Sequence, residues 1–127
     1  MGRIVFSILL LSVALGAGAM QRVVKACERG SMSACEELGI RYITGDGVEE
    51  NGYRALEYLR RACEAGRASA CNSAAFIYAD AEGGVKQDYG KAMRYWKAAC
   101  AHGDGSGCSN YDLARDKLRA LREGRRY

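Results

Sequence analysis

Apolar residues recur along this chain with the spacing of an amphipathic helix, and the pattern itself is repeated. The apolar stripe within residues 55–66 returns within 92–103, and the stripe within 34–42 returns within 70–78. Inside each stripe the apolar positions lie three or four residues apart, which places them on one side of an α-helix. Glycine-rich segments separate the stripes, so each stripe predicts a separate helix.

The stripes predict six helices. The turns at 45–48 and 83–85 each end one helix, and Asn51 and Asp88 are placed to cap the helices that follow. A short N-terminal helix should end around Cys27, and the remaining helices are expected near 33–43, 53–65, 69–81, 89–102 and 108–122. A two-helix unit repeated every 36 or 37 residues is typical of an α-solenoid. We therefore predict an all-α fold, a short solenoid of antiparallel helix hairpins.

The first 19 residues have the pattern of a secretory signal peptide that precedes a repeat domain at 20–127. Arg3 supplies a positive start, residues 4–15 form an uncharged apolar run, and Ala-Gly-Ala at 17–19 fits the small-residue cleavage rule. An uncleaved membrane anchor is the alternative, because the apolar segment is nearly long enough to cross a bilayer. We expect cleavage before Met20, no stable membrane insertion afterwards, and a secreted or periplasmic domain.

Six cysteines follow the same period as the helices. They form pairs eight residues apart, and the pairs recur after 36 and 37 residues. An even count at a fixed spacing, together with the export signal, favours three local disulfides in an oxidising compartment. Zinc is the alternative, but the spacing is longer than in Cys-rich zinc sites and His102 is the single histidine. The predicted bridges are Cys27–Cys35, Cys63–Cys71 and Cys100–Cys108.

Composition and charge narrow the classes of partner. The chain has 127 residues, 49% hydrophobic and 27% charged, with 16 Gly and no Pro, as expected of one globular domain. Its formal charge of +4 is too small to favour a nucleic-acid partner, and much of it follows Ser109. These cations either meet an acidic partner or membrane surface, or complement the dipole of a solvated helix end. We favour the helix end.

Two copies of one motif carry a resemblance to a known family. The first copy reads Leu38-Gly39-x-x-Tyr42-x-x-Gly45-x-Gly47-Val48, followed by Ala55-x-x-Tyr58-x-x-x-Ala62-Cys63-x-x-Gly66, and the second copy runs from Tyr78 to Gly103. Both copies resemble the Sel-one-like repeat, a relative of the tetratricopeptide repeat. The cysteine spacing resembles the secreted, cysteine-rich branch, which implies that each bridge joins the end of one helix to the start of the next. The resemblance covers roughly 23–113 and implies about two full repeats between capping helices.

The sequence contains no recognisable catalytic motif. Ser-x-x-Lys, Lys-Thr-Gly, Gly-x-Ser-x-Gly and a glycine-rich phosphate loop are all missing, so we predict no catalytic residue, no metal and no cofactor. Some similar cysteine-rich repeat proteins are labelled β-lactamase or penicillin-binding protein, so a weak β-lactam hydrolase is the alternative function. That activity requires a serine with a basic neighbour. The serines to check are Ser73, Ser106 and Ser109, beside Lys97, His102 and Arg67.

A binding module is the function we favour, because stacked hairpins leave one helix-lined face free for a protein or peptide ligand. Equivalent outward positions of the first helices form two expected rows. These rows are Glu37, Ser73 and Asn110, and Arg41, Ile77 and Ala114. The residues expected in the core are Tyr58, Leu59, Ala62, Tyr95 and Trp96. Because the repeats are few, the surface is small, and we expect a monomer that binds a peptide or one protein loop.

Overall fold

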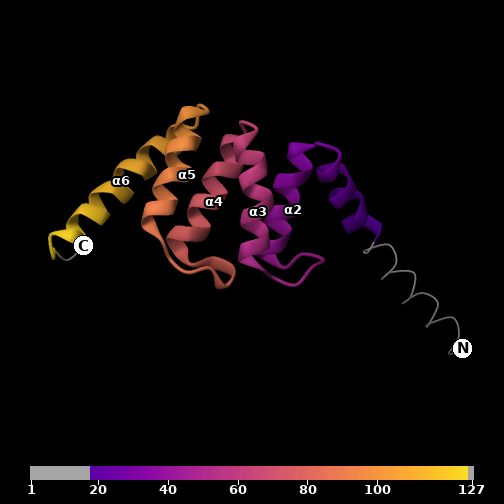
Figure 1. Cartoon of the computed structure of the whole chain (residues 1–127), viewed down its shortest axis with the longest axis horizontal. Helices are drawn as coiled ribbons and strands as arrows, with labels where there is room; N and C mark the ends of the chain where they lie inside the picture. The colour runs from indigo at the N-terminus through magenta and orange to yellow at the C-terminus, as the bar shows by residue number, and fades with distance from the viewer. Residues whose placement is uncertain (1–17, 126–127) are drawn as a thin grey trace, which may run out of the picture.

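All regular structure in the described part of the protein is helical. The computed structural model describes residues 18–125, so the predicted signal peptide lies outside it except for residues 18 and 19. Residues 18–28 are helical and are followed by α2 (Met32–Thr44), α3 (Gly52–Glu64), α4 (Ala68–Asp80), the 3-10 helix η1 (Glu82–Gly84), α5 (Tyr89–Ala101) and α6 (Gly105–Arg122) (Figure 1). The predicted all-α fold is confirmed, and cleavage before Met20 stays a prediction.

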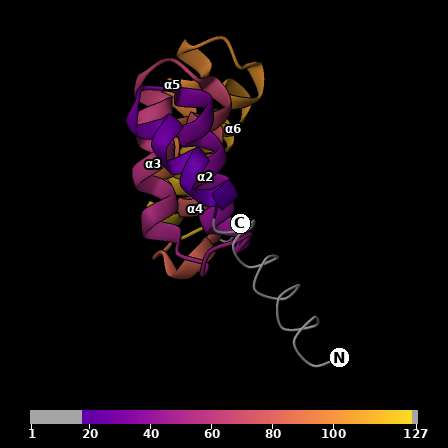
Figure 2. The same cartoon turned by 90° about the vertical axis from the view of Figure 1, so that its right-hand side faces the viewer.

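The helices lie in a row that follows their order in the chain. α2 packs on α3, α3 on α4, α4 on α5 and α5 on α6. Figure 1 shows this row as an arch that runs from the indigo N-terminal segment to the yellow α6. In the view turned by 90°, the helices overlap in projection (Figure 2). Helices that pack mainly on their sequence neighbours form an α-solenoid, as predicted.

Polar side chains begin the helices at the predicted positions. The side chain of Asn51 accepts a hydrogen bond from the Arg54 N–H at 3.1 Å, and that of Asp88 accepts one from the Lys91 N–H at 2.9 Å. Both predicted N-caps are therefore confirmed. The bounds of α2 to α5 lie within one residue of the expected ranges.

The expected start of α6 at residue 108 is wrong, because the helix begins at Gly105. The side chain of Asp104 accepts a hydrogen bond from the Ser106 N–H at 2.9 Å and caps the helix there. A Cβ atom at Gly107 would lie 2.7 Å from the Cβ of Ala99, so the missing side chain lets α6 pack closely on α5. Glycine is a poor helix former, and tertiary packing overrides that preference here.

The three disulfides join equivalent helix ends in the predicted pattern. The bridges are Cys27–Cys35, Cys63–Cys71 and Cys100–Cys108, with Cα–Cα distances of 4.6, 4.6 and 4.7 Å. Each connects the last turn of one helix to the first turn of the next. The turns between them share a glycine at a φ of 94 to 100°, and these glycines are Gly30, Gly66 and Gly103. Each bridge therefore closes the same kind of turn, three times along the solenoid.

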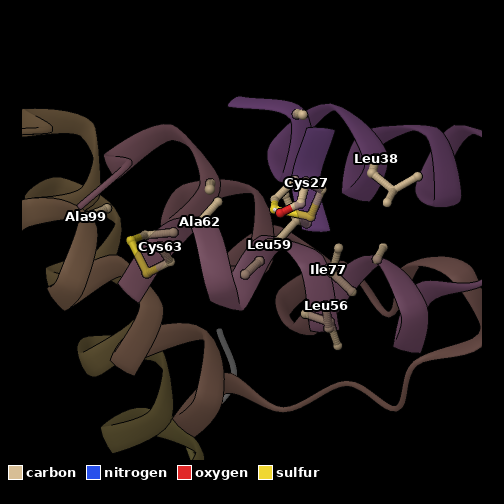
Figure 3. Packing of buried hydrophobic residues seen from close by; sticks show 14 of the residues in the cluster. Cys27, Leu38, Leu56, Leu59, Ala62, Cys63, Ile77 and Ala99 are labelled. Atoms are coloured by element: carbon tan, nitrogen blue, oxygen red, sulfur yellow. Dashed lines mark hydrogen bonds between the residues drawn. A yellow bond between two sulfur atoms is a disulfide. The ribbon is translucent and has the colours of Figure 1, made fainter. Parts of the chain in front are cut away.

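Small residues make up much of the core. The largest fully buried side chains of the core are those of Leu38, Leu59 and Ile77. The same core cluster contains fully buried alanines and cysteines (Figure 3). A Cβ atom at Gly39 would lie 2.6 Å from Cγ of Leu59, so α2 and α3 approach closely there. Of the expected core residues, Leu59, Ala62 and Trp96 are buried, while Tyr58 and Tyr95 are partly buried.

Polar contacts join neighbouring repeats at two equivalent joints. At the first joint, Arg67 Nε donates to Glu36 Oε2 at 2.6 Å. At the second joint, Asn72 Nδ2 lies 3.2 Å from both Asp104 Oδ2 and Ser106 Oγ. Asn72 follows Glu36 by 36 residues and Asp104 follows Arg67 by 37, so the same two positions meet at both joints. The two joints therefore use equivalent positions, but the first is an ion pair and the second is a hydrogen bond from an amide.

We expect acid to weaken the second joint. The hydrogen bond from the Ser106 hydroxyl holds the pKa of Asp104 below its usual value. A carboxylate with a lowered pKa stabilises the fold above its unfolded pKa, and this contribution is lost as the pH falls through the folded pKa. At pH values below about 4 the Tm of the parent protein should therefore decrease. The decrease should be smaller in Asp104→Asn, because the amide of that variant does not titrate. Thermal unfolding of the parent protein and the variant between about pH 3 and 6 measures this difference in Tm. Identical pH profiles would contradict the role given to the Asp104 carboxylate.

Candidate binding surface

Large apolar side chains are exposed at the same position of successive repeats. Among the described residues, the exposed large apolar side chains are Ile40, Tyr53, Phe76, Leu113 and Leu121. Ile40, Phe76 and Leu113 are 38%, 40% and 61% exposed, and they follow one another after 36 and 37 residues. A single exposed apolar residue is common on protein surfaces and indicates no function. One at the same position of every repeat indicates an apolar surface that extends along the solenoid. We call these three residues the apolar row.

The joints between repeats place the apolar row on one side of the solenoid. Ile40 follows Glu36 by one helical turn in α2, and Phe76 follows Asn72 by one turn in α4. Glu36 and Asn72 occupy equivalent positions and reach the start of the next repeat. The row therefore runs beside both joints, along the first helix of each hairpin.

Phe76 is the best supported member of the apolar row. Its ring meets the ring of Trp96 edge on, with centroids 5.3 Å apart and planes at 84°, while Trp96 itself is 6% exposed. Within residues 18–125, the buried side-chain polar atoms without a hydrogen-bond partner are Trp96 Nε1 and Asn72 Oδ1. One belongs to the ring that Phe76 contacts and the other lies one turn before Phe76.

One of the two rows expected from the sequence lines this surface and the other does not. Glu37 is exposed, and Ser73 and Asn110 are partly exposed, each three residues before a member of the apolar row. Ile77 and Ala114 are wrong as surface residues, because they are 2% and 4% exposed. Figure 3 shows Ile77 among the buried residues.

Arg41 shares the second expected row and remains partly exposed. Its guanidinium pairs with Glu37 at 3.0 Å and with Asp46 at 3.6 Å, so it is held close to its own hairpin. The second row fails because each residue turns a helix by about 100°, and a step from 76 to 77 passes from the surface into the core. The predicted period is correct. The sequence signal that would have indicated the exposed face is the apolar residue at each of the equivalent positions 40, 76 and 113.

The contacts of the serines give no support to the hydrolase alternative. Ser106 Oγ donates to Asp104 Oδ1 at 2.6 Å, and Ser109 Oγ donates to the Gly105 carbonyl at 3.4 Å. No serine hydroxyl in the described part of the chain is hydrogen-bonded to a Lys, Arg or His side chain. Over the same residues, no group of three or more His, Cys, Asp or Glu side chains is arranged to hold a metal ion.

Across residues 18–125, no helix is both long enough and apolar enough to span a bilayer.

Comparison with protein families identifies the repeats. Residues 33–66 and 68–104 match the family model of the Sel1 repeat, and together they cover more than half of the chain. The two matches coincide with the α2–α3 and α4–α5 hairpins. A search of curated protein sequences found no match.

Solved structures of repeat proteins are similar over most of this chain. A Sel1 repeat protein from Oxalobacter formigenes is 28% identical, with a TM-score of 0.66, over 75% of this chain and 39% of that one. A protective antigen of uropathogenic Escherichia coli strains, described as having an SLR fold, is 27% identical, with a TM-score of 0.70, over 78% of this chain and 21% of that one. Helicobacter pylori cysteine rich protein B is 27% identical, with a TM-score of 0.64, over 71% of this chain and 67% of that one. The chain thus spans less than half of the first two proteins.

Proposed function

Because the chain belongs to the Sel1 repeat family, we propose that it is an exported binding module that holds a peptide segment of another protein on its apolar row. Sel1 repeats commonly serve as protein-interaction modules. The observation that carries the proposal is the exposure of Ile40, Phe76 and Leu113 at one repeated position. None of the three belongs to the two clusters of buried core residues in the described part of the chain.

The chemistry around the apolar row suits an extended or helical peptide with spaced apolar side chains. Covering a half-exposed Ile, Phe or Leu contributes roughly 1 kcal/mol, so three together support modest affinity. Glu37, Ser73 and Asn110 border the row and offer polar groups to the peptide backbone. An apolar centre with a polar border is the usual composition of a protein interface.

Export is supported by the disulfides. All six cysteines are paired, and such bridges persist in oxidising compartments outside the cytosol. A structural relative is named a cysteine rich protein. A signal peptide with cleavage before Met20 accounts for delivery to such a compartment. We therefore propose a secreted or periplasmic location, which N-terminal sequencing of the exported protein tests.

Substitutions in the apolar row should weaken peptide binding. Peptides selected from a random displayed library by the oxidised protein would be labelled, and their Kd measured by fluorescence anisotropy. Phe76→Ser and Leu113→Ser should each weaken binding about fivefold or more, the effect of losing about 1 kcal/mol of apolar contact. Leu113 is 61% exposed, so its substitution tests the surface with little effect on packing.

Matched controls lie outside the apolar row. Tyr53→Ser and Leu121→Ser remove apolar side chains that are 61% and 52% exposed, and both should leave the Kd unchanged. Thermal unfolding of each variant separates loss of binding from loss of folding. Row variants that bind as tightly as the parent protein, or controls that lose as much affinity, would overturn the proposal.

A further inference from the structure

A cleft of about 350 Å³ lies between α3 and α5. Tyr78 of α4 and Tyr95 of α5 stack along it, with ring centroids 6.0 Å apart and planes 16° from parallel. Tyr78 lies two residues after Phe76, a rotation of about 200° around the helix, so the two side chains leave α4 on nearly opposite sides. The cleft is therefore separate from the apolar row.

Cations outnumber anions around this cleft. Arg60, Lys91 and Arg94 line it together with one carboxylate, Glu64. Arg60 Nη1 donates to Glu64 Oε1 at 2.9 Å, and Lys91 Nζ lies 5.3 Å from the centroid of the Tyr78 ring. Arg94 is exposed and makes no ion pair with any residue in the described part of the chain. Its guanidinium is free to meet an anion in a bidentate geometry.

The first repeat has the same tyrosine stack but different side chains around it. Tyr42 and Tyr58 stack there with centroids 5.8 Å apart and planes 8° from parallel. The residues 37 positions before Arg94 and Ala98 are Glu57 and Arg61. An acidic side chain thus replaces the free cation, and a long side chain replaces the small one beside the cleft. Both repeats therefore share the stack, but the cavity beside Tyr42 is lined by Glu49, Glu50 and Arg54, so carboxylates outnumber cations there.

We propose that the cleft between α3 and α5 is a second binding site, which takes a side-chain carboxylate of an acidic peptide segment on Arg94. The adjoining apolar side chain of that peptide packs against Tyr78 and Tyr95. The Tyr95 phenol is protonated at neutral pH, as tyrosines ordinarily are, so its hydroxyl is a donor for the same carboxylate.

A peptide carboxylate suits this cleft better than a phosphate group does. The two tyrosine rings and Ala98 form an apolar wall, which matches a ligand with an apolar group next to its anion. Glu64 keeps one negative charge among the lining side chains, and it repels a dianion more than a monoanion. Neither feature favours free phosphate or a lipid headgroup.

The proposal is tested with the oxidised full-length protein and two short fluorescein-labelled peptides. One alternates Glu with Leu, and the other alternates Gln with Leu. Fluorescence anisotropy should show binding of the Glu peptide that weakens as salt is raised, and binding of the Gln peptide that is about tenfold weaker or more. Equal affinity for both peptides would overturn the proposal.

Two variants copy residues of the first repeat, where the same fold carries them. Arg94→Glu and Ala98→Arg should each weaken binding of the Glu peptide about tenfold or more. Ala98→Arg is the decisive variant, because it adds positive charge and so would strengthen any nonspecific electrostatic attraction. Loss of binding in that variant therefore supports occlusion of the cleft, and a gain would contradict the proposal. Arg122→Glu makes the same charge change as Arg94→Glu on exposed α6, and it should leave the Kd within about twofold.

Two further measurements separate this proposal from its rivals. Phe76→Ser should leave binding of the Glu peptide unchanged, so failure of the apolar row and failure of the cleft are distinguishable. Inorganic phosphate added at millimolar concentration should compete no better than chloride at equal ionic strength. Stronger competition by phosphate, lost in Arg94→Glu, would reassign the cleft to phosphate and overturn the peptide proposal.

Discussion

Reduction of the three disulfides is expected to unfold the protein. Each bridge joins cysteines eight residues apart, which in the chain-entropy account contributes about 2.5 kcal/mol, or about 7.5 kcal/mol for the three. The whole free energy of unfolding of a domain this small is about 5 to 15 kcal/mol, so reduction removes at least about half of it. Denaturant unfolding followed by far-ultraviolet circular dichroism, with and without reductant, measures the loss. Equal midpoints in the two conditions would contradict this expectation.

Loss of the central bridge should cost more than loss of the C-terminal bridge. The two loops have the same length, so their entropic contributions are equal and any difference comes from native packing. Cys63 and Cys71 are 4% and 0% exposed, whereas Cys100 and Cys108 are partly exposed. Paired Cys-to-Ala variants of each bridge provide the comparison. A C-terminal pair variant that is the less stable of the two would contradict the assignment of the core.

The second large effect is expected at the closest contact between α2 and α3. Leu59 is fully buried, and Leu59→Ala should lower the free energy of unfolding by about 2 to 5 kcal/mol. Gly39→Ala alone should also destabilise, by about 1 to 3 kcal/mol, because its new Cβ would lie 2.6 Å from Leu59 Cγ. In the double variant the alanine methyl occupies part of the space that Leu59 leaves. Its loss should therefore be smaller than the sum of the single losses.

A matched glycine controls for helix propensity in that comparison. Gly105 lies in the first turn of α6, and a Cβ there would meet no atom within 4 Å. Gly105→Ala should leave stability unchanged or raise it by up to about 1 kcal/mol. Additive losses in the Gly39 and Leu59 cycle, or a stabilising Gly39→Ala, would show that the two helices do not meet as described.

Local signals made most of the fold predictable. Asn51 and Asp88 each precede a helix with a side chain that can accept its free N–H groups, and both cap their helices as expected. The cysteine period likewise predicted the bridges, because the pairing follows from the repeated turn. The start of α6 was missed because Gly105 and Gly107 are unfavourable in an isolated helix. Contact with α5 makes Gly107 favourable, and that contact is tertiary.

The candidate surface was less predictable, because it depends on rotation about each helix. Ile77 was expected to be an apolar contact residue on the binding surface, yet it is buried, and the neighbouring Phe76 is exposed. The two residues are adjacent in the chain. A repeat alignment identifies equivalent positions, but it does not say which of them face the solvent. The cleft beside Arg94 depends on packing between α3 and α5, and its traces in the sequence are the changes from Glu57 to Arg94 and from Arg61 to Ala98.

The most direct test of the proposed function is to locate a bound peptide on the oxidised protein. Backbone amide chemical shifts, followed by nuclear magnetic resonance during titration with a library-selected peptide, report the residues that it contacts. The account predicts the largest shifts around Ile40, Phe76 and Leu113, on α2, α4 and α6. Shifts confined to α3 and α5, with the apolar row unaffected, would contradict it.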